Sequence, residues 1–391
     1  MKRPFFVLII IFLASGCSQN TSIFDLPESQ GVSSDRLERI DSYLNKAIKE
    51  NQIPGAVALI RRNNKIIYNK AFGYSDVENK IKNSTDDIFR IASMTKAVTS
   101  LAILMLWEEG KFNLDDPIEK YIPEFKNLKI LTEFNETDST YLSKPANNKI
   151  SIRHLLTHTS GIGYGLVDKD PHFIKLYQKH GIVDLFTTDS INIKSNVKKL
   201  AQLPLHHEPG EAFTYGESLD VLGYFIEIIS QKSLDVFFKE RIFDPLEMKD
   251  TYFYLPTTHQ DRLVPVQTKK DGFWTKYQGD FYDTNYPKKG AQTFLSGGAG
   301  LSSTTADYSN FLQMFLNKGS YNGKQILGKK TAELVYINQN GHILDSSDEH
   351  GSSIGLVFGL TSEKVQALGG KGSTGTFYWG GYFNTYFFAD P

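Results

Sequence analysis

Residues 89–111 read FRIASMTKAVTSLAILMLWEEGK, and this stretch decides the fold of the chain. From Val98 onward, apolar residues recur at the spacing of one helical face, and further apolar side chains fill the other faces. A helix that is apolar nearly all round is typical of a buried core element, and Gly110 marks its end. We therefore predict a buried central helix, with Ser93 and Lys96 on one face of its first turn.

Ser93 and Lys96 are candidates for a nucleophile and its base. A helix N-terminus offers free N–H groups and a partial positive charge, which stabilise an oxyanion that forms beside the serine. Burial disfavours the ammonium form of a lysine, so that Lys96 can accept the serine proton. Serine is also a common helix cap, and a second S-x-x-K occurs at Ser195 and Lys198 in a polar stretch. Spacing alone leaves both interpretations open.

The composition is that of an ordinary globular protein. The chain has 391 residues, of which 40% are hydrophobic and 22% charged, enough for a large core in one domain or two interleaved ones. The formal net charge is −1, and no basic stripe alternates with aromatic residues. Both observations argue against nucleic acid as a partner.

Residues 1–17 are predicted to be a lipoprotein signal peptide. A short basic start precedes the apolar run FFVLIIIFLA, which is too short to span a bilayer comfortably, and the sole cysteine follows in ASGC. Cys17 would be lipidated and form the mature N-terminus of an exported bacterial protein anchored in the cell envelope. Ser18 favours the outer membrane, on its periplasmic side, in a Gram-negative cell. Cleavage by ordinary signal peptidase is the alternative.

The rest of the chain is predicted to be a polar tether at residues 18–32 and an α+β domain at residues 33–391. An amphipathic helix capped by Ser33 or Ser34 precedes AVALI and KIIYNKAFG, which form an antiparallel hairpin around RRNN. Strand-like segments return in SIGLVFGL and TFYWGGYFNTYFF. We predict an antiparallel sheet from both chain ends, about 33–90 and about 290–391, flanked by helices, with a mainly helical insertion at about 91–289.

Several blocks make the chain resemble the serine β-lactamase and penicillin-binding-protein family, and within it the class C β-lactamase-related group. SMTK at the start of a buried helix is similar to the S-x-x-K motif of that family. Five further blocks follow in the order of that group, which is more specific than any single motif. They are GKFNLDDPIEKYIPEF, SIRHLLTHTSGI, HEPGEAFTYGES, RIFDPLEMKDTYF and GGAGLSSTTADYSNFLQMF.

The second motif of the family is Y-x-N, and Y-G-E at residues 215–217 resembles it. Tyr215 matches the tyrosine that relays protons between nucleophile, lysine and leaving group. Glu217 stands where the family usually has asparagine. Because an ionised glutamate only accepts hydrogen bonds, Glu217 could hold the ammonium of Lys96 or contact the substrate differently.

The third motif is K-T-G on a strand, and Trp379-Gly380-Gly381 stand in its place. This variant resembles the one in esterases of the family. A lysine there pairs with a substrate carboxylate, whereas tryptophan offers an apolar face and one N–H donor. Gly380 and Gly381 let substrate approach the strand closely. The resemblance implies that the backbone N–H of Tyr382 joins that of Ser93 as an oxyanion donor.

The resemblance implies a serine hydrolase that acts through an acyl-enzyme on small ester, amide or peptidoglycan-like substrates. Ser93, Lys96 and Tyr215 would be catalytic, and no metal or organic cofactor would be required. A carboxylesterase-like activity is favoured by Trp379, with D-amino-acid peptidase or β-lactamase activity as the alternative. A non-catalytic ligand-binding or sensor protein with a degenerate site is the alternative of another class. The oligomeric state does not follow from the sequence.

The chain ends at FFADP, so the C-terminal strand and helix usual in the family are expected to be missing. Three other motifs are weaker. GSSIG at residues 351–355 matches a nucleophile elbow, but a strand-like segment follows it and no histidine occurs beyond His350. HLLTH spaces two histidines as a helical metal pair without HExxH, and GKGSTG is a lone G-x-G-x-x-G before a strand.

Overall fold

The computed structural model describes residues 22–391 apart from residues 280, 342, 344–352, 357 and 370–371. The helices are α1 (Ser34–Lys49), α2 (Thr95–Glu108), α3 (Ile152–Leu156), α4 (Pro171–Lys179), α5 (Ile193–Leu200), α6 (Ser218–Ser230), α7 (Leu234–Phe238), α8 (Thr305–Leu316), α9 (Lys329–Glu333) and α11 (Glu363–Ala367). The strands are β1 (Gly55–Arg62), β2 (Lys65–Asp76), β3 (Ile81–Lys82), β4 (Phe89–Arg90), β5 (Lys129–Phe134), β6 (Tyr141–Pro145), β7 (Gln267–Lys270), β8 (Phe273–Lys276), β9 (Ser302–Ser303), β10 (Ser320–Tyr321), β11 (Lys324–Gln325), β12 (Ser353–Ile354), β13 (Gly359–Leu360), β14 (Phe377–Gly381) and β15 (Thr385–Ala389).

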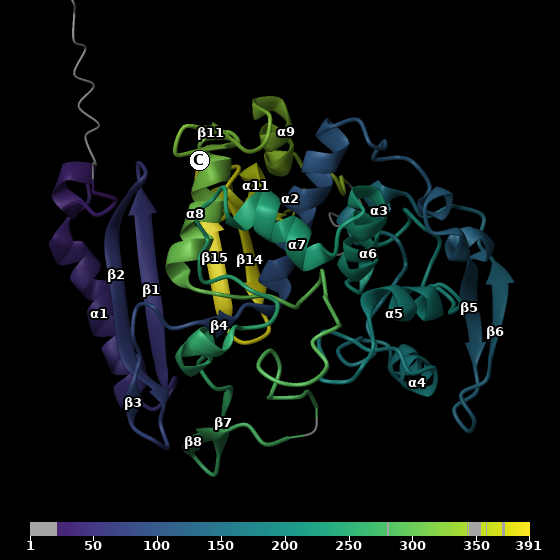
Figure 1. Ribbon diagram of the computed structural model, residues 1–391, viewed down its shortest axis with the longest axis horizontal. Coiled ribbons are helices and arrows are strands. Elements are labelled where there is room, and N and C mark those ends of the chain that lie inside the picture. The colour runs from purple at the N-terminus through teal and green to yellow at the C-terminus, as the bar shows by residue number, and fades with distance from the viewer. Residues whose placement is uncertain (1–21, 280, 342, 344–352, 357, 370–371) are drawn as a thin grey trace, which may run out of the picture.

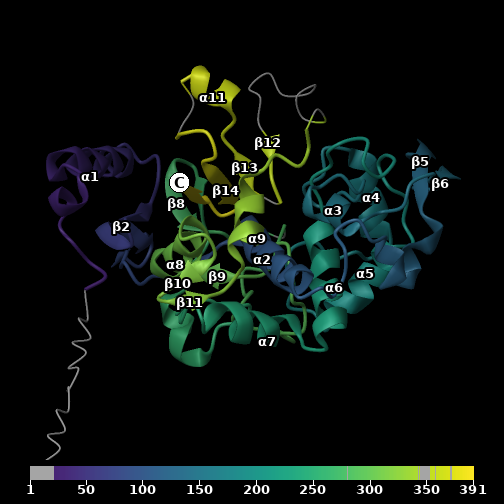
Figure 2. The same cartoon turned by 90° about the horizontal axis from the view of Figure 1, so that it is seen from above.

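The molecule has a sheet side and a helical side. In both Figure 1 and Figure 2, α1, β1 and β2 lie at one end, and α3 to α6 with the hairpin β5–β6 lie at the other. Helix α2 runs between them, with β14 and β15 close by. The hairpin β5–β6 belongs to the helical side, whereas the hairpin β7–β8 lies near the sheet side, where Lys276 of β8 pairs with Asp76 of β2. This arrangement is the predicted α+β architecture.

The predicted N-terminal helix and hairpin are confirmed. Ser33 caps α1, because its side chain accepts a hydrogen bond from the backbone N–H of Arg36. Strands β1 and β2 pair in antiparallel fashion around Asn63 and Asn64. Both asparagines have positive φ, 49° and 64°, the backbone conformation that a tight hairpin turn needs.

The two chain ends form two separate sheets, which differs from the single sheet predicted. One has the order β1-β2-β3 and the other β12-β13-β14-β15. In the part of the chain that the structure describes, β1 and β15 each have an edge without a strand partner. A groove of about 2420 Å³, lined by residues of both strands, of α1 and of α8, separates these edges, so no ladder joins them.

The core is organised around α2, as the sequence predicts. Residues from Thr95 to Leu106 are all buried, including the polar Lys96, Thr99 and Ser100. Gly110, with φ of 70°, follows the end of the helix. Phe112 and Phe225, from the loop after α2 and from α6, meet edge to face at 4.9 Å between ring centroids. Helix α2 is therefore held from several sides, which fixes the side chains at its N-terminal end.

The predicted signal peptide and Cys17 lie outside the described residues. Among the helices that the structure does describe, each is too short or too polar to cross a bilayer.

Candidate active site

Ser93 lies on a short 3-10 turn, Ala92–Met94, which leads directly into α2. The sequence predicted Ser93 inside the first turn of the helix. In the structure it lies instead in the 3-10 turn that precedes α2. Ala92, the residue before the serine, has φ of 41°, a conformation that non-glycine residues rarely adopt. Strained backbone of this kind is concentrated at functional sites, where the surrounding structure holds it in place.

Lys96 is fully buried, and three oxygen atoms surround its amine. The Nζ atom lies 3.2 Å from Ser93 Oγ, 2.9 Å from the hydroxyl of Tyr164 and 2.7 Å from the carbonyl oxygen of Gly298. A carbonyl can only accept, so one N–H of Lys96 always points at Gly298. The other two partners are hydroxyls, which can donate or accept. The amine can therefore turn a lone pair toward Ser93, as a general base must.

Tyr215 comes close to the same amine with the face of its ring. The centroid of the ring lies 4.8 Å from Lys96 Nζ, and the ring also borders those of His158, Tyr164 and Trp379 at 4.7, 5.6 and 6.0 Å. The structure thus brings three of the predicted site residues, Ser93, Lys96 and Tyr215, to one place. The proton-relay role of Tyr215 stays a prediction.

Two loops that carry the tyrosines are joined by backbone contacts. The N–H of Thr214 donates to His158 O at 2.8 Å, and the N–H of Glu217 donates to Gly163 O at 3.2 Å. At Gly216 a Cβ atom would lie 2.2 Å from Ile162 O, so only glycine allows this close approach. The glycines of the sequence around Tyr164 and Tyr215 therefore set the spacing between the two rings.

Glu217 is buried, with 1% of its surface exposed, and its carboxylate accepts a hydrogen bond from Asn196 Nδ2 at 3.3 Å. Its position at the start of α6 directs it toward Asn196 and Asp184 rather than into contact with Lys96. Burial, and after it the nearby Asp184, raises the pKa of Glu217 well above its ordinary value. The predicted contact of Glu217 with substrate stays a prediction, and the structure supports a neutral, protonated side chain.

The aromatic and imidazole groups around Lys96 are also held neutral. Burial, followed by the nearby positive charge of Lys96, lowers the pKa of His158 well below its ordinary value. Burial, and then the neighbouring Tyr215, raises the pKa of Tyr164 well above its ordinary value. His158 is therefore an uncharged packing neighbour of Tyr215, and Tyr164 keeps its hydroxyl proton.

The strand that carries the third motif, β14, passes directly beside the turn of Ser93. A Cβ atom at Gly381 would lie 2.2 Å from Ile91 O, so that glycine is required for packing. At Gly380 a Cβ atom would meet only ordinary contacts, 3.6 Å or longer. Trp379 lies beside Tyr215, whereas the side chain of Tyr382 is half exposed. Substrate and oxyanion contacts of this strand stay predictions.

The described residues of the weaker motifs do not form a second site; residues 351–352 of GSSIG and 370–371 of GKGSTG lie outside the described residues. Ser195 lies on the surface helix α5, where Lys198 pairs with Glu124. Ser353 of GSSIG lies in β12, with its hydroxyl donating to Leu360 O at 3.3 Å, and a strand follows it. Within the residues that the structure describes, no group of three or more His, Cys, Asp or Glu side chains is placed to hold a metal ion.

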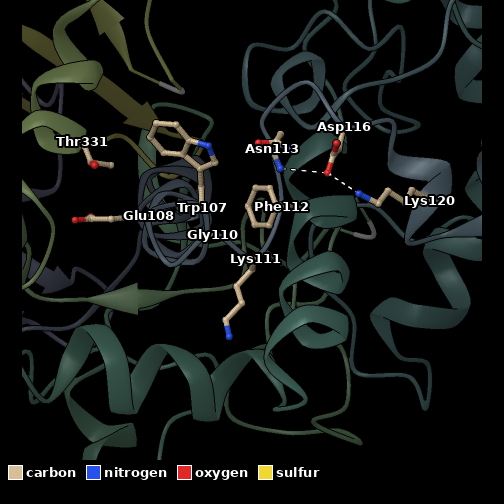
Figure 3. Close-up of a pocket in the computed structure, with 9 residues that line it drawn as sticks. All are labelled: Trp107, Glu108, Gly110, Lys111, Phe112, Asn113, Asp116, Lys120 and Thr331. Carbon is tan, nitrogen blue, oxygen red and sulfur yellow. Dashed lines mark hydrogen bonds and ion pairs between the residues drawn. The ribbon is translucent and has the colours of Figure 1, made fainter.

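A pocket elsewhere on the molecule is separate from this chemistry. Figure 3 shows this hollow of about 460 Å³, which lies at the C-terminal end of α2 and is bordered by Trp107, Phe112 and Thr331. Helix α2 has 14 residues, a length of about 20 Å, and Lys96 lies at its other end.

Sequence reasoning missed Tyr164 and Gly298 as partners of Lys96. Tyr164 follows directly after HTSGIG, and Gly298 lies in GGAGLSS, two stretches of the family blocks for which the resemblance implied no catalytic residue. Lys96 is separated from them by 68 and 202 positions in the chain. The presence of a tyrosine next to a glycine-rich turn is the one signal available, and it is weak.

Comparisons with known proteins identify the relatives of this chain. The family described as Beta-lactamase matches residues 40–391. Protein Rv1367c of Mycobacterium tuberculosis is 31% identical, over 87% of this chain and 83% of its own. Esterase EstB of Burkholderia gladioli is 28% identical, over 90% of this chain and 86% of its own. The solved structure of EstCE1, a hydrolase with promiscuous acyltransferase activity, has a TM-score of 0.75 and 26% identity, covering 91% of this chain and 90% of that one.

The protonation of Glu217 predicts how stability changes with pH. Its folded-state pKa lies above its ordinary value of 4.5, so its contribution to stability is full below about pH 4.5 and is lost as the pH rises through the folded-state pKa. Glu217→Gln cannot ionise. We measure the free energy of unfolding of both proteins in urea. The value for the variant minus that for the wild type should increase as the pH rises from about 5 to about 8.

The control for this measurement is Glu240→Gln, at an exposed carboxylate that pairs with Lys232. That variant should show no gain with rising pH. A difference between Glu217→Gln and the wild type that stays constant or shrinks as the pH rises would mean that Glu217 is ionised in the folded protein.

Proposed function

This chain belongs to the beta-lactamase family, and we propose that it is a serine hydrolase that cleaves carboxylic esters through an acyl-enzyme on Ser93. The observation that carries the proposal is the 3.2 Å contact between Ser93 Oγ and the buried amine of Lys96. A nucleophile within hydrogen-bond reach of a base, with the base oriented by a third group, is the arrangement that nucleophilic catalysis needs.

In the first half of the reaction, Ser93 Oγ attacks the ester carbonyl carbon while its proton passes to Lys96 Nζ. The carbonyl electron pair moves to oxygen, and the N–H groups of Ser93 and Tyr382 stabilise the resulting oxyanion. When the tetrahedral intermediate collapses, the bond to the leaving alcohol breaks. The alcohol oxygen takes up the proton held by Lys96, through the hydroxyl of Tyr215, and the acyl group stays on Ser93.

In the second half, a water molecule attacks the acyl carbon and gives its proton to Lys96. Collapse of the second tetrahedral intermediate breaks the bond to Ser93 Oγ, which recovers that proton, and the carboxylic acid leaves. Tyr164 supports both halves, because its hydroxyl bonds Nζ at 2.9 Å and its raised pKa keeps it neutral. Gly298 O holds another N–H of the amine, so the lone pair stays directed at Ser93.

Esters are favoured over β-lactams and D-peptides by the residue at position 379. A lysine there would pair with a substrate carboxylate, and Trp379 supplies an apolar ring beside Tyr215 instead. The similarity to Esterase EstB and to EstCE1 supports the same choice. D-amino-acid peptidase or β-lactamase activity is the alternative within the family.

The nucleophile is tested by treating soluble residues 18–391 with a fluorophosphonate and measuring intact mass. Wild type should gain one adduct, and Ser93→Ala should gain none, because the reagent reacts with an activated serine. The matched control is Ser195→Ala, in the surface S-x-x-K of α5, which should label like the wild type. A well-folded wild type without an adduct would contradict the proposal and favour a non-catalytic ligand-binding protein.

The ester preference is tested with Trp379→Lys, which places a cation where the β-lactamases of the family have one. We expect the ratio of kcat/KM for a β-lactam to that for a p-nitrophenyl ester to rise roughly 10-fold or more, since a charged hydrogen bond to the substrate carboxylate contributes about 1.5–3 kcal/mol. Trp379→Phe, which adds no charge, is the control. An unchanged ratio would contradict the argument from the missing cation.

The membrane anchor is a further proposal, and it is supported by the sequence alone. We propose that Cys17 is lipidated and tethers the enzyme to the cell envelope. The expected result is incorporation of labelled palmitate into the wild type and not into Cys17→Ser, together with release of the variant from the membrane fraction. Equal labelling and equal membrane content of the two proteins would contradict it.

A further inference from the structure

The turn Ser296–Gly300 lies between α2 and α6, and Asp220 holds it. Asp220 is in the first turn of α6 and has 1% of its surface exposed. Its Oδ1 atom accepts a hydrogen bond from Ser296 Oγ at 2.6 Å and from the N–H of Gly298 at 3.3 Å. A carboxyl group is rarely buried this deeply unless it is paired or hydrogen-bonded, because removing it from water is costly.

The turn is too close to α6 for any residue except glycine at two positions. A Cβ atom at Gly297 would lie 2.5 Å from Leu219 O, and one at Gly298 would lie 2.4 Å from Asp220 Oδ2. From the other side, the hydroxyl of Thr99 on α2 donates to Gly297 O at 2.6 Å. The turn is therefore clamped between α2 and α6, with little freedom to rotate.

A continuous chain of hydrogen bonds runs from Asp220 to Lys96. Ser296 Oγ donates to Asp220, and the same oxygen accepts from the N–H of Ala299 at 2.9 Å. That N–H belongs to the same peptide group as the carbonyl of Gly298, which accepts from Lys96 Nζ at 2.7 Å. In a trans peptide the N–H and the C=O point in opposite directions, so fixing one fixes the other. Chains of this kind also polarise one another.

Asp220 also matters for the charge near the base. The three direct partners of Lys96 are oxygen atoms of neutral groups, so the ammonium that forms during the reaction has no carboxylate in direct contact. The ionisable groups that act on Asp220 or are acted on by it are Lys96, Glu217, Asp184, Tyr164 and Tyr286. Of these only Lys96 can carry a positive charge.

We propose that Asp220 is a positioning residue for the catalytic base: it anchors Ser296 and the Gly298–Ala299 peptide, and thereby aims the amine of Lys96 at Ser93. The inference rests on the proposed function of Ser93 and Lys96. Asp220 does not touch substrate in this account. It acts through the turn on the direction of the lysine, and through its carboxyl group on the ammonium that forms there during the reaction.

The experiment compares Asp220→Asn and Ser296→Ala with the wild type, by the second-order rate of fluorophosphonate labelling and by kcat and KM for a p-nitrophenyl ester. We expect labelling and kcat to fall roughly 100-fold in Asp220→Asn, with KM little changed, because the base is misdirected rather than the substrate lost. Ser296→Ala should slow both by a smaller factor, since Asp220 still bonds the N–H of Gly298.

The pH profile distinguishes positioning from a general structural role. Burial raises the pKa of Asp220, and the hydrogen bond from Ser296 and the charge of Lys96 oppose that rise. Asp220→Asn removes this acidic group from the surroundings of Lys96, so the rate of labelling at acidic pH should fall off at a lower pH than in the wild type. Ser296→Ala keeps the carboxyl group and removes only one of its hydrogen bonds, so this fall-off should move less than in Asp220→Asn. The control is Asp307→Asn: Asp307 is likewise a buried carboxylate in the first turn of a helix, α8, and accepts from the N–H of Asp250 at 2.7 Å and the hydroxyl of Thr251 at 2.8 Å. It should label at the wild-type rate per folded molecule.

The outcomes separate the two proposals. A wild type that does not label contradicts the proposed function itself. A wild type that labels, with Asp220→Asn folded and equal to it in rate and pH profile, overturns the role of Asp220 alone. If Asp220→Asn does not fold, Ser296→Ala decides: a slower rate at unchanged KM supports the role, and a wild-type rate overturns it.

Discussion

The burial of Lys96 is the constraint on which the rest of the site depends. An amine that is removed from water loses its hydration, and the loss must be made up by hydrogen bonds from the protein. The partners come from three segments, the turn of Ser93, the loop of Tyr164 and the turn of Gly298. The fold has to bring these segments together around the N-terminal end of α2, and the all-round apolar surface of that helix is what buries the lysine.

Around the lysine, neighbouring segments of the chain pack closely against one another at glycine residues. Glycines at positions 216, 298 and 381 each stand where a Cβ atom would collide with a neighbouring segment. The turn of Ser93 is fixed by a strained alanine on one side and by β14 on the other. Neutral tyrosine, histidine and glutamate side chains complete the surroundings. Such a site is preorganised, so little structural change is needed when charge develops in the reaction.

The sequence predicted the parts of this arrangement that local pattern determines. The buried helix, the cap at Ser33, the hairpin around Asn63 and Asn64, and the pairing of Ser93 with Lys96 all follow from periodicity and spacing. Tyr164, Asp220 and Gly298 could not be found in this way, because their roles arise from contacts between distant parts of the chain. The single predicted sheet was wrong in detail for the same reason: strand order depends on which edges meet, and β1 and β15 face each other across a groove.

The central claim is that the buried amine of Lys96 activates Ser93, and the most direct test is the labelling rate of Lys96→Met. Methionine fills much the same volume without an amine, so the variant keeps the packing of α2 and removes the base. The account predicts that the second-order rate constant for reaction of Ser93 with a fluorophosphonate falls at least roughly 100-fold, the lower end of the range for a general base. A folded Lys96→Met protein that labels at the wild-type rate would contradict it.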